Sequence, residues 1–155
     1  MSVVNFVHHL NHQKGNKKGM IMRKVAIVGS RKYTNKQRIQ EFIYKLKEDL
    51  EGGVEIVSGG QKEGADGYAK KFALEFEMKY SEFPPSHYNH NMYCVLGANS
   101  YNKPYYISNY FKRNRQIAEY SDFVVAFIPK GMVSKGTENT INYAKRLNKR
   151  IIIIN

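Results

Sequence analysis

The stretch Ile128 to Tyr143 reads I-P-K-G-M-V-S-K-G-T-E-N-T-I-N-Y, and it guides the interpretation of the rest of the chain. It follows the apolar run Phe123 to Phe127, which is typical of a buried strand, and it continues into residues with helical spacing. A strand, a glycine-bearing loop and a helix in this order expose backbone N–H groups at the positive end of the helix dipole. The stretch therefore predicts a site for a phosphate or another anion.

Two upstream stretches have the same strand–loop–helix form. They are V-A-I-V-G-S-R at Val25–Arg31 and I-V-S-G-G-Q-K-E-G-A-D at Ile56–Asp66. Because ligands bind beyond the carboxyl ends of parallel strands, the three loops predict one pocket for an anion. The alternative is that each glycine serves only a turn. The predicted ligand-binding residues of these loops are Gly29, Ser30, Arg31, Ser58, Gly59, Gly60, Gly136 and Thr137.

Familiar nucleotide and metal motifs are missing from the sequence. Neither G-x-x-x-x-G-K-[ST] nor G-x-G-x-x-G occurs, so neither a P-loop nor a standard dinucleotide-binding loop is predicted. His87 and His90 have no cysteine or acidic residue nearby, which argues against a metal site. We therefore expect no metal and no resident cofactor.

The chain alternates short apolar runs with segments of helical periodicity. The predicted strands are the runs at 24–28, 54–57, 79–83, 122–128 and 150–154. After the first run, a helix is predicted to begin at Thr34, with Gln37 completing a capping box. This order predicts an α/β protein with a parallel sheet and right-handed crossovers. The almost uniformly apolar last run predicts a sheet that is covered on both faces.

Length and charge constrain the organisation and the partners. The 155 residues carry a net charge of +12, which attracts nucleic acid, nucleotides or acidic partners. Because the lysines are spread along the chain, a generally basic surface is the alternative. We expect one domain, 23–155, after a polar N-terminal arm, 1–22. A single cysteine and the lack of an apolar run of ~20 residues indicate a cytoplasmic protein without a membrane partner.

Residues 86–109 interrupt the alternation with a Tyr- and Asn-rich segment that is too long for an ordinary connection. Such segments commonly act as lids or partner-binding surfaces. The aromatic side chains in and just after it could stack on a base or pack the segment onto the domain; they are Tyr101, Tyr105, Tyr106, Tyr110 and Phe111. In the next helix Asn114 stands on the apolar stripe, so we expect it to fix a loop or contact a ligand.

Five blocks, in order, carry a resemblance to a known superfamily. They are V-A-I-V-G-S-R, I-V-S-G-G-x-x-x-G-A-D-x-x-A, F-P, K-R-N-x-x-I-A-E-Y-S-D and A-F-I-P-K-G…K-G-T-x-x-T-I-N-Y-A. The chain resembles the SLOG superfamily, which includes the LOG phosphoribohydrolases and DNA-processing protein A, and within it the small stand-alone YspA/YpsA-like proteins. The resemblance implies a three-layer Rossmann-like fold, with helices on both faces of a parallel sheet, that binds a nucleotide or nucleotide-derived ligand. It also implies that copies could pair as a homo-oligomer through helices next to the site.

The resemblance assigns parts of the ligand to particular loops. The base and ribose would lie near Gly29–Ser30 and Gly59–Gly60, and the phosphate at the helix start that contains Gly136. The residues that match the phosphate loop in kind, or lie near the family arginine, are Pro129, Gly131, Gly136, Thr137 and Arg113.

The acidic residue of the LOG enzymes is replaced in this chain. Its position is Thr140, and Glu138 points about 200° away from it around a helix at ~100° per residue. Cleavage of an N-glycosidic bond needs a carboxylate to activate water or to stabilise positive charge on the sugar. Asp66 is the best placed carboxylate, and its alternative role is to cap or orient the second glycine loop. Other carboxylates near the strand ends are Glu63, Glu119 and Asp122. The candidate catalytic residues are Asp66, Arg113 and Glu138.

The sequence is compatible with three functions. The first is binding or sensing of a nucleotide-derived ligand without turnover, which the replacement at Thr140 favours. The second is hydrolysis of the bond between ribose and base, with Asp66 or Glu138 as the acid or base. The third is binding of single-stranded nucleic acid through the basic surface and the aromatic segment.

Overall fold

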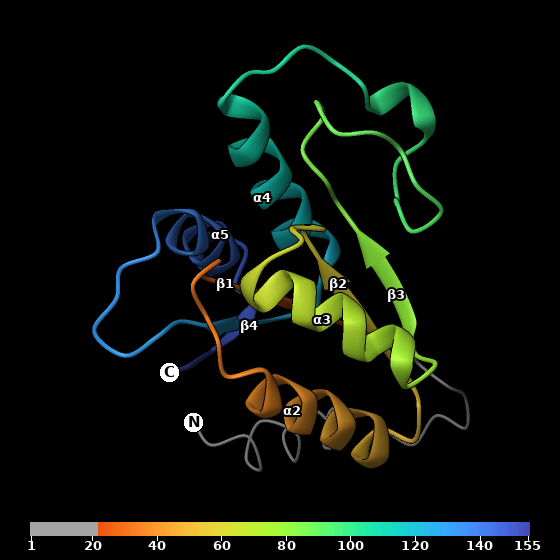
Figure 1. Ribbon diagram of the computed structural model, residues 1–155, viewed down its shortest axis with the longest axis vertical. Helices are drawn as coiled ribbons and strands as arrows, with labels where there is room; N and C mark the ends of the chain where they lie inside the picture. The colour runs from red at the N-terminus through yellow and green to blue at the C-terminus, as the bar shows by residue number, and fades with distance from the viewer. Residues whose placement is uncertain (1–21) are drawn as a thin grey trace.

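A parallel sheet with helices on both faces forms the domain (Figure 1). The computed structural model describes residues 22–155, so the predicted N-terminal arm, apart from Met22, lies outside the described residues. The elements, in chain order, are β1 (Arg23–Gly29), α2 (Lys36–Asp49), β2 (Val54–Ser58), α3 (Gly64–Glu75), β3 (Lys79–Glu82), η1 (Ala98–Ser100), α4 (Ser108–Tyr120), β4 (Phe123–Phe127), α5 (Lys135–Arg146) and β5 (Arg150–Ile154).

The described strands pair in the order β3-β2-β1-β4-β5, and every pairing is parallel. From β1 the chain moves outward through β2 to β3, and it then returns to place β4 on the other side of β1. The direction of the crossovers therefore reverses between β1 and β4, and in sheets of this kind ligands bind at that point. The predicted three-layer α/β fold is confirmed.

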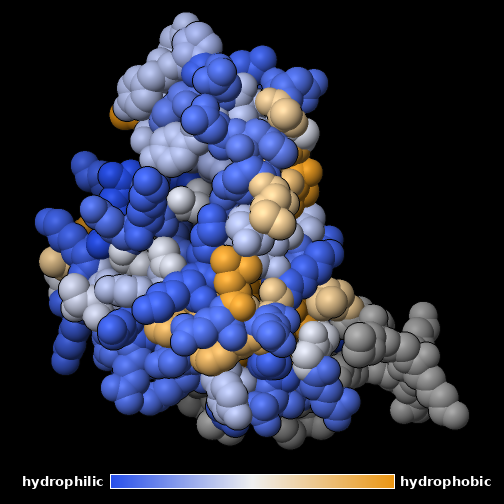
Figure 2. Space-filling model, turned by 45° about the vertical axis from the view of Figure 1, so that its right-hand side comes forward, coloured by the Kyte–Doolittle hydropathy of each residue, from blue (hydrophilic) through white to orange (hydrophobic). Residues whose placement is uncertain are grey.

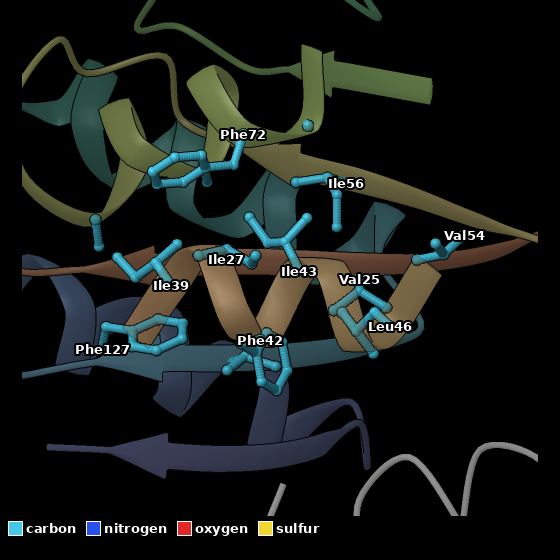
Figure 3. Close-up of a cluster of buried hydrophobic side chains, with 14 of the residues drawn as sticks. Val25, Ile27, Ile39, Phe42, Ile43, Leu46, Val54, Ile56, Phe72 and Phe127 are labelled. Carbon is cyan, nitrogen blue, oxygen red and sulfur yellow. The ribbon is translucent and has the colours of Figure 1, made fainter. Parts of the chain in front are cut away.

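The two faces of the sheet are built from the alternation of side chains along each strand. In β1, Val25 and Ile27 pack toward α2 and α3, whereas Ala26 and Val28 pack toward α4 and α5. Figure 3 shows Phe42 and Ile43 of α2 against the strands. Both faces of the central strands are thus covered, which accounts for their almost continuous apolar sequence.

One local prediction was wrong. The N-cap of α2 is Asn35 rather than Thr34, because the Asn35 side chain accepts a hydrogen bond from the Arg38 amide at 3.2 Å. The sheet is covered on both faces, as predicted, but the apolar run of its edge strand β5 is not uniformly buried. Ile153 of β5 is 52% exposed, since β5 has a strand neighbour on one side only in the described sheet.

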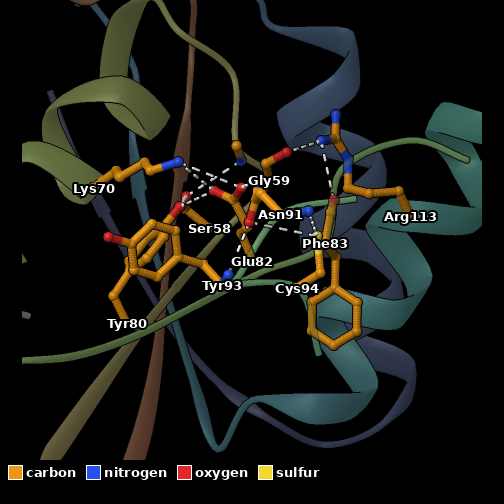
Figure 4. A network of polar contacts seen from close by, with 11 residues as sticks. Ser58, Gly59, Lys70, Tyr80, Glu82, Phe83, Asn91, Tyr93, Cys94 and Arg113 are labelled. Atoms are coloured by element: carbon orange, nitrogen blue, oxygen red, sulfur yellow. Dashed lines mark hydrogen bonds and ion pairs between the residues drawn. The ribbon is translucent and has the colours of Figure 1, made fainter. Parts of the chain in front are cut away.

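The long segment spans residues 83–107, between β3 and α4, so residues 108 and 109 of the predicted segment begin α4. The buried carboxylate of Glu82 holds the segment at its base (Figure 4). The Tyr80 hydroxyl donates to Glu82 Oε2 at 2.7 Å, Lys70 Nζ lies 3.3 Å from the same oxygen, and Asn91 Nδ2 donates to Oε1. The Glu82 amide also donates to the carbonyl of Tyr93 at 2.9 Å. The segment is therefore tied to the end of β3, and within it the buried Tyr101 ring packs against the His90 ring, 5.9 Å away centre to centre.

Hydrophilic residues dominate the face shown in Figure 2, and apolar residues are scattered among them in small groups. No helix in residues 22–155 is both long and apolar enough to cross a membrane.

Candidate functional site

A cavity of about 610 Å³ lies at the point where the crossovers reverse, beyond the carboxyl ends of β1 and β4. We call it the first cavity. The loop after β1, the start of α3, the inner face of α4 and the loop between β4 and α5 form its walls. Segments far apart in the sequence thus converge at one edge of the sheet, as ligand binding in such folds requires.

The loop after β1 forms one wall, and Ser30 holds it in place. The Ser30 amide donates to the carbonyl of Phe127 at 3.1 Å, which joins the end of β1 to the end of β4. Its Oγ accepts a hydrogen bond from the Lys32 amide at 3.0 Å, and its carbonyl accepts one from the Ala65 amide at 3.3 Å. These bonds present Arg31 and Lys32 at the cavity wall, so this wall is cationic.

The start of α5 forms the opposite wall. Ser134 is the N-cap, but its side chain makes no hydrogen bond to the helix amides and instead pairs with Thr137 Oγ1 at 2.7 Å. The first-turn amides near Gly136 and Thr137 are therefore not capped by Ser134, and they lie at the positive end of the helix dipole. Asn114 fixes this turn from α4, because its Nδ2 donates to the Gly136 carbonyl at 3.3 Å.

Asp66 and Arg113 form the polar floor of the first cavity, and both are buried. Burial raises the pKa of the Asp66 carboxyl to about 6, although Arg113 and the backbone amides of Gly59 and Gln61 act in the opposite direction. Burial lowers the pKa of Arg113, against the influence of Asp66. Arg113 Nη1 donates to the carbonyl of Gly59 at 2.7 Å, and Nε donates to Asn114 Oδ1 at 3.0 Å. The floor is thus a fixed cation beside a carboxyl that titrates near neutral pH.

Gly59 lies between these two side chains and has to be a glycine. A Cβ built at this position would lie 2.7 Å from Asp66 Oδ2 and 2.9 Å from Arg113 Cζ. Gly59 is therefore required by close packing beneath the site, and it does not line the cavity.

The structure brings together most of the predicted site residues. Those that line the first cavity are Gly29, Ser30, Arg31, Asp66, Arg113, Asn114, Gly136 and Thr137, and Thr140 joins them. The others lie elsewhere: Ser58 is buried and bonds Tyr80, Gly60 lines the second cavity, and Gly59, Pro129, Gly131 and the exposed Glu138 line neither cavity.

A second cavity, of about 870 Å³, adjoins the first. It lies between α3 and the long segment, with Glu82 at its base, and it shares Arg31 and Gln61 with the first cavity. Its wall includes Lys71 and Tyr88. Nothing in the local sequence predicts this cavity, because the path of the long segment depends on its distant contacts with Glu82.

Apolar side chains form the mouth of the first cavity, and sequence reasoning missed part of this wall. Ile107 and Phe111 come from the start of α4, and Met132 and Val133 come from the loop before α5. All four are exposed, with Val133 at 79%. The sequence feature that could have predicted this wall is the apolar pair Met132–Val133 within an otherwise polar, glycine-bearing loop.

The comparisons with known proteins agree with this geometry. Residues 23–90 match the YspA, cpYpsA-related SLOG family. This segment belongs to that family. No curated protein matches the chain in sequence.

Two solved structures share the fold of the chain. A molybdenum cofactor binding protein from the phototrophic bacterium Rippkaea orientalis is similar with a TM-score of 0.63 and 20% identity, over 87% of this chain and 77% of that one. The molybdenum cofactor carrier protein MCP from Chlamydomonas reinhardtii is similar with a TM-score of 0.59 and 17% identity, over 85% and 76% of the two chains. At these identities the likeness concerns the fold.

Proposed function

We propose that this SLOG domain binds a nucleotide or nucleotide-derived small molecule in the first cavity. The observation that carries the proposal is the convergence of Arg31, Lys135 and the start of α5, which Ser134 leaves uncapped, around one cavity. A helix start and a guanidinium are both good partners for a phosphate. The proposal places the phosphate between Arg31 and Gly136.

The mouth of the cavity suits the rest of a nucleotide. Phe111 and Ile107 face the opening from α4, and Met132 and Val133 face it from the loop before α5. Bases offer flat apolar faces that stack on aromatic and aliphatic side chains. The proposal therefore places the base at the apolar mouth and the phosphate at the cationic wall.

The comparisons support a small-molecule ligand. The proteins of similar fold from Rippkaea orientalis and Chlamydomonas reinhardtii are named for binding and carrying the molybdenum cofactor. We take from this that the architecture is used to hold a ligand of limited size, and we assign the class of ligand for this chain from its own first cavity.

Hydrolysis of the bond between ribose and base is the second candidate, and Asp66 favours it. A buried carboxyl whose pKa is about 6 is suited to accept a proton from an attacking water near neutral pH. In that reaction the oxygen of the water joins C1′ of the ribose, and the base departs with a proton. Against it, the position of the LOG glutamate holds Thr140, whose hydroxyl donates to the Gly136 carbonyl at 3.3 Å. Binding without turnover is therefore the first choice.

Calorimetric titration of the protein with AMP, adenosine and single-stranded DNA tests the proposal. We expect AMP to bind about tenfold or more tightly than adenosine, because charge-assisted hydrogen bonds to phosphate contribute ~1.5–3 kcal/mol. The variant Arg31→Ala should remove most of this difference, whereas Lys145→Gln, at the far end of α5, should keep it. Equal binding of AMP and adenosine, or binding of DNA that AMP does not displace, would contradict the proposal.

Chromatography of the same mixtures separates binding from turnover. We expect AMP to remain intact after incubation with the wild-type protein. Release of adenine that disappears in Asp66→Asn would support the hydrolase instead.

A further inference from the structure

The second cavity adjoins the first but has no part in the binding of a mononucleotide as proposed above. Arg31 and Gln61 line both cavities, so the two spaces meet at these side chains. Their volumes, about 610 Å³ and about 870 Å³, both lie in the range of ~300–1,000 Å³ that small-molecule sites occupy. Together they leave room for a ligand of two units, each the size of a nucleotide.

An aromatic cluster divides the two spaces. The His87 ring lies 5.1 Å from the Tyr88 ring and 5.1 Å from the Tyr110 ring, centre to centre. Tyr110 faces the first cavity, whereas His87 and Tyr88 face the second. Each cavity therefore has an aromatic side chain of its own on which a base can stack.

Positive charge continues from the first cavity into the second. Lys62 and Lys71 are exposed and line the second cavity, whereas Lys70 is already paired with Glu82. Glu63 is the exposed acidic residue on this wall, so cations remain in excess. A ligand that enters the second cavity is therefore expected to carry negative charge.

The junction itself offers donors. Arg31 presents a guanidinium, whose fork of N–H groups matches phosphate oxygens. The side-chain nitrogen of Gln61 is buried and has no hydrogen-bond partner among residues 22–155. Buried donors are normally satisfied, and a group of the ligand at the junction would be the partner that this one lacks.

We infer that the ligand is a dinucleotide joined through its phosphates, with one nucleoside in each cavity and the linking phosphates at Arg31 and Gln61. This inference rests on the proposed function, because the first nucleoside occupies the site described there. The inference specifies the class of ligand for the proposed function. It also means that residues of the long segment form part of the binding site for the second nucleoside.

The test compares AMP with diadenosine diphosphate, in which a pyrophosphate joins two adenosines, by calorimetric titration. We expect the dinucleotide to bind at least about tenfold more tightly than AMP, because its second half gains contacts at no further loss of rigid-body freedom. The double variant Lys62→Gln/Lys71→Gln should lose most of that advantage and leave the affinity for AMP unchanged. Both lysines are exposed, so the variant is expected to fold.

The double variant Lys36→Gln/Lys145→Gln is the matched control. It removes the same charge at exposed positions outside both cavities, and it should retain the advantage of the dinucleotide. If AMP binds but the dinucleotide binds no more tightly, or if both double variants behave alike, the inference fails and the proposed function stands. If neither ligand binds, both fail. A tetranucleotide of DNA that binds more tightly than the dinucleotide would also overturn it, in favour of a nucleic-acid strand.

Discussion

Two buried carboxylates, Glu55 in β2 and Asp66 in α3, show how the domain separates support from function. Glu55 Oε1 accepts hydrogen bonds from Ser81 Oγ at 2.6 Å and from Tyr120 OH at 2.7 Å, and Lys79 Nζ lies 3.4 Å from Oε2. Burial alone would raise the pKa of Glu55, but these partners lower it below the ordinary value. In Asp66 burial prevails, and its pKa rises to about 6.

The two carboxyls differ in the kind of donors that hold them, hydroxyls for Glu55 and backbone amides for Asp66, and in the side on which each carboxyl faces. Glu55 links β2 to β3 and to the end of α4, and it lines neither cavity. Asp66 faces the first cavity, where a ligand can approach it. A carboxylate that joins neighbouring elements supports the fold, whereas one that faces a cavity is available for a ligand or a reaction.

The largest expected effect is on stability. Replacement of Glu55 by alanine leaves the buried hydroxyl of Ser81 and the partly buried hydroxyl of Tyr120 without their acceptor, and it should lower the free energy of unfolding by about 4 kcal/mol. Asp66→Asn should change it by less than about 1 kcal/mol near its pKa, because the loss of a buried charge offsets the weaker hydrogen bonds. Urea denaturation of both variants at pH 6 measures the contrast. Equal losses would show that the two carboxylates have the same role.

The pH dependence of stability sharpens the same comparison. The folded-state pKa of Asp66, about 6, lies above its ordinary value of 3.8. Its stabilising contribution is therefore present below pH 3.8 and is lost as the pH rises through 6. Between pH 4 and 7 the wild type should lose up to about 3 kcal/mol relative to Asp66→Asn, at ~1.4 kcal/mol per pKa unit.

Urea denaturation at several pH values compares the two proteins. Glu55 should act in the opposite direction, since its lowered pKa stabilises the fold above its ordinary range, and that contribution is lost as the pH falls. A constant difference between wild type and Asp66→Asn across this range would show that the Asp66 pKa is not raised.

Anion binding should depend on the protonation of Asp66. Sulfate carries the same charge throughout this range, so it is a suitable probe for the first cavity. Below pH 6 the neutral Asp66 no longer opposes the positive charges of Arg113 and Arg31. We expect sulfate to bind about tenfold more tightly at pH 5 than at pH 7.5, which corresponds to ~1.4 kcal/mol. Calorimetry on Asp66→Asn should show little change, and an equal change in that variant would assign the effect to another group.

The smallest expected effect on stability is that of alanine at Gly136, and it should be opposite in sign to the effect of alanine at Gly59. A Cβ at Gly136 would meet nothing within 4 Å, so Gly136→Ala should stabilise α5 by about 0.5–1 kcal/mol. The same methyl would project into the proposed phosphate position and weaken AMP binding severalfold. Gly59→Ala, which has no room beside Arg113, should instead lose stability. Thermal denaturation and AMP titration of both variants test this difference, and a destabilised Gly136→Ala would contradict it.

The sequence was sufficient to predict the elements and their layering. Apolar runs that lead into glycine-bearing loops identified β1, β2 and β4 to within a residue or two, because strands buried on both faces leave a clear signal. The sequence was less informative about the burial of the edge strand and about the N-cap residue of α2. The exposure of Ile153 depends on the position of β5 in the sheet, and Thr34 and Asn35 are both acceptable caps whose choice depends on the entry of the chain.

The convergence of the glycine loops could be predicted from the sequence, whereas the parts of the cavity walls that depend on distant contacts could not. Ser30 and Thr137 line the same cavity because parallel strands bring their loops to one edge of the sheet, and that follows from the order of the elements. The roles of Glu55 and Glu82 depend on partners far along the chain, such as Tyr120 and Asn91. A glutamate inside an apolar strand, V-E-I-V, was the one available sign of such a network.

The most direct test of the central claim is an NMR titration of the isotope-labelled protein with AMP, observed through its backbone amides. We predict that the largest shifts occur at Ser30, Gly136 and Thr137, which line the first cavity from both sides. Shifts that leave these amides unchanged and follow the exposed lysines over the surface would contradict a dedicated nucleotide site.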